Sequence, residues 1–167
     1  MTISEITEKM IARSEGNLHD ISHFLKVWAY ARTIGECEGL DAETQFLLET
    51  EALIHDIACP LCRKKYGNTN GKNQEKESGP LVEEILTDTN LTEQQKERIS
   101  YVVCHHHTYE GVDGIDWQIL LEADYLVNAE ENGYAKAAVR QFRDTVARTA
   151  AAKRLLDSAF QLNSTEE

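Results

Sequence analysis

The amino-acid sequence predicts an all-α protein, folded as one compact bundle of about six to eight helices. Apolar residues recur every three to four positions along most of the chain, and no long run alternates strictly between apolar and polar residues. The chain has 167 residues, of which 41% are hydrophobic, and this is enough for a single well-buried core. We therefore expect one domain over residues 1–167, with no repeat and no linker.

Polar caps and glycines delimit the predicted helices. A capping box, in which a Thr and a Glu or Gln three residues later satisfy each other's backbone amides, occurs twice. An Asp before an apolar run is expected to cap a helix, and a Gly after one is expected to end it. The predicted starts are Thr2 with Glu5, Asp20, Asp41, Ser78 or Gly79, Thr92 with Gln95, and Asp116, and the predicted ends include Gly16, Gly39, Ala58, His107 and Gly133.

Two segments depart from this regular pattern. Residues 58–79 hold three of the nine glycines and no apolar helical stripe, so they are predicted to form a long loop. A loop beyond about 12–15 residues inside a compact domain is usually functional or disordered. Residues 134–160 are Ala-rich and amphipathic, which predicts C-terminal helices.

Charge and cysteine content limit the partners and the compartment. The chain carries 29 acidic and 17 basic side chains, a net charge of −12, which opposes binding to nucleic-acid polymers and anionic membranes. No apolar run approaches the roughly 18 residues of a membrane span, and the N-terminus does not resemble a signal peptide. We expect a cytoplasmic protein with reduced thiols whose partner is a small molecule, and we leave open that it forms a homo-oligomer.

Two ionisable side chains stand side by side among apolar residues. His55 and Asp56 follow Ala-Leu-Ile and precede Ile-Ala, and Asp124 lies in the similar run Leu-Leu-Glu-Ala-Asp-Tyr-Leu-Val. An unpaired buried charge is costly. A divalent metal ion would remove that cost, since neutral imidazole and carboxylate both bind first-row metals. The competing interpretation is structural, with a hydrogen-bonded core histidine and paired carboxylates.

Three ordered motifs, DISHFLKV, ALIHDI and EAD, resemble the HD-domain superfamily of metal-dependent phosphohydrolases, an all-helical fold named for its adjacent His-Asp pair. The resemblance covers residues 17–130. Lys26, in the first motif, stands where the family usually has Arg. The resemblance implies a metal site formed by His23, His55, Asp56 and Asp124.

The resemblance also implies candidates for a second metal. Some members bind two metals, with further ligands between the His-Asp pair and the last Asp. The matching positions are Glu75, where those members have His, and the pair His106 and His107. Glu75 could also serve as a base or a surface charge, and the histidines could be a solvated helix end. His19 competes with His23 as a ligand, but the motif selects His23 and leaves His19 in the preceding loop.

The segment over residues 58–77 is basic, unlike the rest of the chain. Its net charge is +3, whereas the other 147 residues carry −15. Because the segment directly follows the His-Asp pair, we expect it to cover the metal and hold a phosphate group. The alternative is a solvated basic loop. The residues expected to bind the substrate are Arg63, Lys64, Lys65 and Lys72.

These features predict a metal-dependent phosphohydrolase that acts on a small phosphorylated molecule, such as a nucleotide or another phosphomonoester, through an activated water. Asp56 would be a ligand and a proton acceptor, Lys64 or Lys65 would stabilise charge on the phosphate, and His106 or His107 would protonate the leaving oxygen.

The cofactor is expected to be one or two divalent ions among Mn, Fe, Co, Ni, Zn and Mg. Two alternatives are an HD-fold di-iron oxygenase and a non-catalytic, nucleotide-binding regulatory module. The sequence does not choose the substrate.

Overall fold

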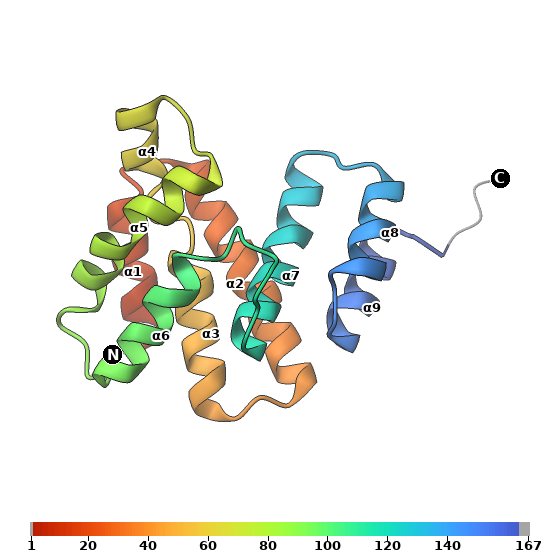
Figure 1. Cartoon of the computed structure of the whole chain (residues 1–167), viewed down its shortest axis with the longest axis horizontal. Helices are drawn as coiled ribbons and strands as arrows, with labels where there is room; N and C mark the ends of the chain where they lie inside the picture. The colour runs from red at the N-terminus through yellow and green to blue at the C-terminus, as the bar shows by residue number, and fades with distance from the viewer. Residues whose placement is uncertain (1, 164–167) are drawn as a thin grey trace.

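A computed structural model describes residues 2–163, and all regular structure within that range is helical (Figure 1). The predicted all-α class is confirmed, and the ends of the predicted domain, Met1 and residues 164–167, lie outside the described residues. None of the described helices is both long enough and apolar enough to cross a membrane. The helices are α1 (Ile3–Arg13), α2 (Leu18–Glu38), α3 (Ala42–Ile54), α4 (Cys59–Tyr66), α5 (Gly71–Leu86), α6 (Glu93–Val103), α7 (Ile115–Glu131), α8 (Lys136–Thr145) and α9 (Ala150–Ala159).

Three of the six predicted helix starts are found. Both capping boxes are present, and the Asp41 carboxylate caps α3. Two predicted Asp caps are wrong. Asn17 rather than Asp20 caps α2, and Gly114 rather than Asp116 precedes α7. In both cases the predicted Asp lies in the first turn of the helix, where its charge favours the helix dipole but its side chain binds an arginine instead.

The segment over residues 58–79 is not a loop, contrary to the prediction. It contains α4 and the first half of α5, separated by a short turn that ends at the Asn70 cap. The predicted cap at Ser78 or Gly79 therefore lies inside α5, as does Pro80. The described residues form nine helices, one more than the upper end of the expected six to eight, and α4 in this segment is a helix that the sequence did not predict.

Small polar side chains explain why this segment shows no helical stripe. Gln74 and Ser78 are buried on α5 at positions where a helix usually has apolar residues. The Gln74 amide donates to the carbonyl of Thr69, and the Ser78 hydroxyl donates to the carbonyl of Gln74. Because these two donors are satisfied locally, α5 can be buried without an apolar pattern, although the Oε1 atom of Gln74 has no hydrogen-bond partner among the described residues.

Two hydrophobic clusters form the core, and α2 and α3 contribute to both. The first cluster joins these helices to α7, α8 and α9, and the second joins them to α1, α5 and α6. In Figure 1 the two groups lie on opposite sides of the central helices. Polar residues from α2, α3 and α7 therefore meet at the boundary between the clusters.

One buried acid outside that boundary has no hydrogen-bond partner. Both carboxyl oxygens of Glu51 on α3 are buried and unpartnered among the described residues. Burial holds the pKa of Glu51 well above its usual value, and the nearby charge of Asp116 raises it further. The Asp116 carboxylate accepts two hydrogen bonds from Arg98, and it donates none to Glu51.

Replacing Glu51 with leucine is expected to stabilise the protein by about 1–3 kcal/mol, the cost of an unsatisfied buried polar group. The pKa of Glu51 is higher in the folded protein than in the unfolded chain. At pH values above the ordinary carboxyl range, Glu51 must therefore take up a proton when the protein folds. Wild-type stability should therefore fall as pH rises, and the advantage of Glu51→Leu should be larger at pH 8 than at pH 5. Urea unfolding at both pH values measures this, with Glu8→Leu on the exposed face of α1 as control. A less stable Glu51→Leu protein at pH 8 would contradict it.

Candidate metal centre

Helix ends bring the predicted ligands together. His55 is the C-cap of α3 and Asp56 follows it in the same turn, while His106 and His107 lie in the turn after α6. His23 comes from α2, and Asp124 from the middle of α7. A turn after a helix lets consecutive side chains point in different directions, which is why Asp56 can face both histidine groups.

The first group consists of His23, His55, Asp56 and Asp124. The Nε2 atoms of His23 and His55 are 3.2 Å apart. The Oδ1 atom of Asp124 lies 3.2 Å from the first and 3.4 Å from the second, and the Oδ2 atom of Asp56 lies 3.7 Å from each. Ligand atoms that share a first-row metal at bond lengths near 2.1 Å are about 3.0–3.4 Å apart. The distances among His23, His55 and Asp124 fall within this range, and those to Asp56 exceed it by about 0.3 Å, so the group fits one ion after a small movement of Asp56.

Hydrogen bonds at the far side of each ring decide which nitrogen faces the group. The Nδ1 atom of His55 donates to the carbonyl of Ala52 at 2.8 Å, and that of His23 donates to Glu131 at 2.9 Å. Because each Nδ1 carries a proton, each Nε2 has a lone pair that points at the other ring. The two Nε2 atoms can therefore be bridged by one proton or bind one metal ion. The buried Oδ1 of Asp124 lies against these two Nε2 atoms and has no other hydrogen-bond partner among the described residues, which also favours a cation here.

The pKa of His23 reflects the same demand for a positive charge. Burial lowers it, but the carboxylates of Asp124, Asp56 and Glu131 outweigh burial and raise it to about 9. Without a metal, His23 therefore keeps a proton at neutral pH. A divalent ion would replace that proton, so metal binding at this site should release protons.

A second group shares Asp56 with the first. The other carboxylate oxygen of Asp56, Oδ1, lies 3.0 Å from Nε2 of His106 and 3.7 Å from Nε2 of His107. These ligand atoms lie within 4.8 Å of one another. Burial and the neighbouring His106 lower the pKa of His107 to about 4, so its ring is neutral and able to ligate. Asp56 thus stands between two groups with the chemistry of metal sites.

Glu75 lies beside this second group but does not join it. Its carboxylate accepts a hydrogen bond from the Thr108 hydroxyl at 3.1 Å, directly after the histidine triplet. No cluster of metal-ligating atoms among the described residues includes Glu75. Its place as a ligand of a second metal stays a prediction.

Charged side chains behind His23 fix the orientation of its ring. The second oxygen of Glu131, Oε1, lies 2.7 Å from Nζ of Lys26, which also contacts Glu130 at 2.8 Å. Lys26, at the position where the family usually has Arg, therefore binds this acidic pair. His19 was predicted to lie in a loop, but it lies in the first turn of α2, directly after the Asn17 cap. Its side chain is 73% exposed and lies 3.8 Å from Glu131, so His23 is the histidine that enters the buried group.

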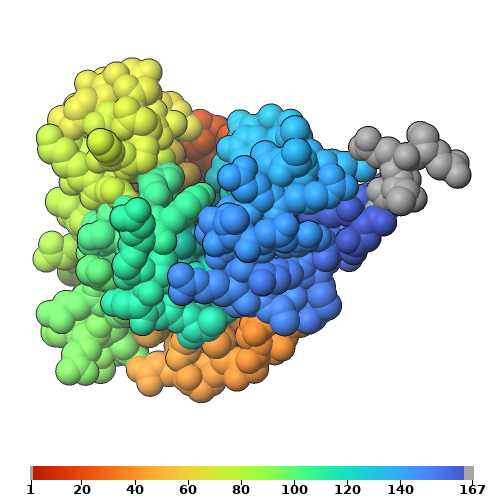
Figure 2. All heavy atoms as spheres, turned by 45° about the vertical axis from the view of Figure 1, so that its right-hand side comes forward, coloured from red at the N-terminus to blue at the C-terminus, as the bar shows by residue number. Residues whose placement is uncertain are grey.

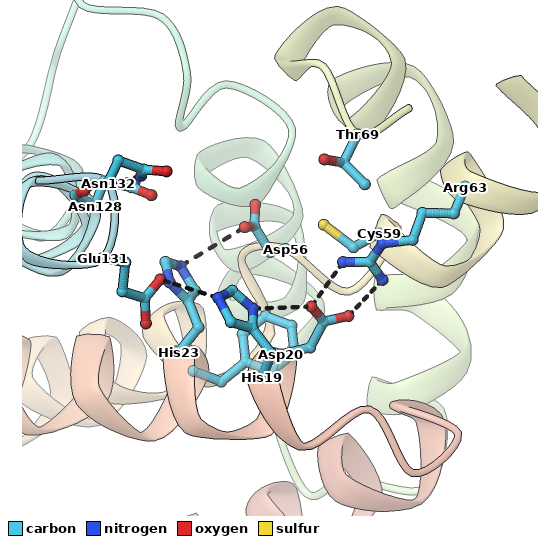
Figure 3. Close-up of a pocket in the computed structure, with 11 residues that line it drawn as sticks. His19, Asp20, His23, Asp56, Cys59, Arg63, Thr69, Asn128, Glu131 and Asn132 are labelled. Carbon is cyan, nitrogen blue, oxygen red and sulfur yellow. Dashed lines mark hydrogen bonds and ion pairs between the residues drawn. The ribbon is translucent and has the colours of Figure 1, made fainter. Parts of the chain in front are cut away.

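A cavity of about 160 Å³ opens beside the first group. Figure 3 shows that α2, α4 and α7 supply its walls, with Asp56 at its base. In Figure 2 a notch separates the surface of α4 and α5 from that of α7 and α8. Arg63 lines the cavity, and its guanidinium donates two hydrogen bonds to Asp20, at 2.6 and 2.7 Å.

The lysines of the basic segment do not line this cavity. Lys64 pairs with Glu15 at 2.7 Å, Lys65 pairs with Glu77 at 2.8 Å, and Lys72 is exposed. The helical conformation of the segment explains this, since it turns successive side chains away from one another by 100°. The roles given to these lysines stay predictions, and Arg63 is the one predicted substrate-binding residue on the cavity wall.

The sequence interpretation missed three residues around the first group. Glu131 and Asn128 line the cavity from α7, and Cys59 lines it from α4. Asn128 lies four and Glu131 seven residues after Asp124, spacings that put them on the same helical face. That spacing was a usable signal for both, whereas the helix that carries Cys59 was not predicted.

Comparison with known proteins agrees with this geometry. A family model of the HD domain matches residues 20–151, a range that contains both histidine groups and Asp124. A search of curated proteins found no match. The chain therefore belongs to the HD-domain family, which in general comprises metal-dependent hydrolases.

Proposed function

We propose that the protein is a phosphohydrolase that uses divalent metal to hydrolyse a small phosphate ester. The observation that carries this proposal is the position of Asp56, whose two carboxylate oxygens face two different histidine groups. A carboxylate between two such groups suits a pair of metals that clamp a phosphoryl group. Family membership supports the reaction class, and the cavity beside Asp56 offers the substrate a place.

The chain's own residues divide the work. A bound divalent metal supplies Lewis acidity, which polarises the phosphoryl group and lowers the pKa of water. The negative charge of Asp56 would stabilise a cation in either histidine group, and its two oxygens fix the position of one group relative to the other. When the second group holds no metal, Asp56 also raises the pKa of His106 above its usual value, although burial opposes this, and His106 is then placed to hold a proton near the leaving oxygen. Arg63, oriented by Asp20, is placed to contact the phosphate.

The paired histidine groups also suit two iron ions, which favours an oxygenase as the second candidate function. Imidazole and carboxylate ligands are common to both kinds of site. The two candidates differ in what they consume: one needs water and a phosphate ester, the other needs molecular oxygen and a reduced substrate.

Metal analysis followed by activity assays tests the proposal. Protein purified without chelator should contain divalent metal in a fixed ratio to the chain. The loaded protein should release phosphate from p-nitrophenyl phosphate and from members of a panel of phosphorylated metabolites, without oxygen uptake. Iron content with oxygen consumption and no phosphate release would select the oxygenase. Tight nucleotide binding without any turnover would select the regulatory module.

A further inference from the structure

Two asparagines continue the helical face that begins at the metal group. Asp124, Asn128 and Asn132 follow one another at intervals of four residues on α7 and its C-cap, so their side chains form one stripe. Asn128 and Asn132 both line the cavity, and Figure 3 shows their amides on the wall opposite Arg63. The stripe leads from the metal group outward to the surface.

The side-chain amides of Asn128 and Asn132 have donors and acceptors that the protein does not use. The Nδ2 atom of Asn132 donates to the backbone carbonyl of Asn128 at 2.8 Å, which holds the side chain of Asn132 along the wall. The amide of Asn128 makes no hydrogen bond to any other residue in the described part of the chain, although it is half-buried. An amide offers both donors and an acceptor, so it pairs well with hydroxyl groups.

The charges around the cavity set a limit on the ligand. Of the described residues that line it, Arg63 alone has a Lys or Arg side chain, and Asp20 already binds two of its N–H groups. Glu131 adds a negative charge to the same wall. The metal group can take one phosphoryl group, but the outer wall offers no cluster of cations to hold a second or third phosphate.

We infer that the substrate is a phosphate monoester with a single phosphoryl group and an uncharged, hydroxyl-bearing alcohol, whose hydroxyls bind Asn128 and Asn132. This inference rests on the proposed function and makes Asn128 a determinant of substrate specificity. Both sugar phosphates and nucleoside monophosphates have this chemistry. Nucleoside triphosphates do not, because Arg63 is the one Lys or Arg side chain among the described residues that line the cavity, and Asp20 already holds two of its N–H groups.

Steady-state kinetics on the metal-loaded protein test the inference with four probes: ribose 5-phosphate, adenosine 5′-monophosphate, adenosine 5′-triphosphate and p-nitrophenyl phosphate. We expect kcat/KM for at least one of the two hydroxyl-bearing monophosphates to exceed that for the triphosphate at least tenfold. The preferred monophosphate tells a sugar from a nucleoside as the alcohol. In Asn128→Leu, the ratio of kcat/KM for that monophosphate to that for p-nitrophenyl phosphate should fall by about tenfold, the effect of one lost hydrogen bond. Asn90→Ala, at an exposed position far along the chain, is the control and should keep the wild-type ratio.

Three outcomes would overturn the inference. Equal efficiency on the triphosphate would refute the limit to one phosphoryl group. Hydrolysis of p-nitrophenyl phosphate with an unchanged ratio in Asn128→Leu would refute the role of Asn128 while leaving the proposed function intact. No hydrolysis of any probe by protein that holds its metal would overturn the proposed function and this inference with it.

Discussion

Replacing Asp56 with alanine is expected to abolish metal binding and phosphate release together. Asp56 faces His23 and His55 with one oxygen and His106 and His107 with the other, so one substitution removes a ligand from both groups. It also removes a negative charge that raises the pKa of His23 and His106. The first group then keeps Asp124 as its carboxylate, the second group keeps none, and a divalent cation loses much of its electrostatic support.

The experiment compares Asp56→Ala with Asp56→Asn and with Asp88→Ala at an exposed position. Metal content by elemental analysis and phosphate release should both fall to background in the first variant. Asp56→Asn keeps the shape of the side chain but not its charge, so any metal it retains reports on geometry alone. Asp88→Ala should behave like wild type. Full metal content and turnover in Asp56→Ala would remove Asp56 from the site.

Replacing Glu131 with glutamine is expected to weaken metal binding by about 10–100-fold, the usual effect of losing a partner that orients a ligating histidine. Glu131 accepts the Nδ1 proton of His23 at 2.9 Å and is held in turn by Lys26 at 2.7 Å. Its negative charge makes the opposite nitrogen of His23 a stronger ligand. Glutamine can still accept a hydrogen bond, but without the charge.

A neighbouring residue provides a matched control for Glu131. Glu130 contacts Lys26 as Glu131 does, at 2.8 Å, and is largely exposed. Glu130→Gln should therefore leave metal affinity near the wild-type value, while Lys26→Met should lower it by less than Glu131→Gln. Competition with a chromogenic chelator measures the affinities directly, without any need for turnover. If Glu130→Gln and Glu131→Gln weaken binding equally, general surface charge rather than orientation of His23 accounts for the effect.

Local sequence signals were sufficient where a helix depends on its own residues. The capping boxes at Thr2 and Thr92 and the Asp41 cap are all present, because a cap satisfies backbone amides within three residues of itself. Local reasoning went wrong at Asp20 and Asp116. Each carboxylate is drawn away from its own backbone by an arginine distant in the chain, Arg63 in one case and Arg98 in the other.

The residues of the candidate metal group also differ in how far the sequence alone could identify them. His55 and Asp56 could be singled out from the sequence because ionisable residues among apolar ones are costly unless they are compensated. His23 and Asp124 needed the resemblance to a known family, since each alone is common in helices. Glu131 could have been found from its spacing to Asp124, whereas its bond to His23 joins residues 108 positions apart.

The chain's local pattern of apolar residues, caps and isolated charges was enough to predict a helical bundle and to single out His55 and Asp56 as candidate metal ligands, because these features depend on the cost of burial and on neighbours within one turn. The direction of the basic side chains depended on the fold. Lys64 and Lys65 follow Arg63 directly, yet Glu15 and Glu77 hold them away from the cavity that Arg63 lines. Net charge along a segment does not reveal where each charge points, because a helix spreads consecutive residues around its axis and distant partners select among them.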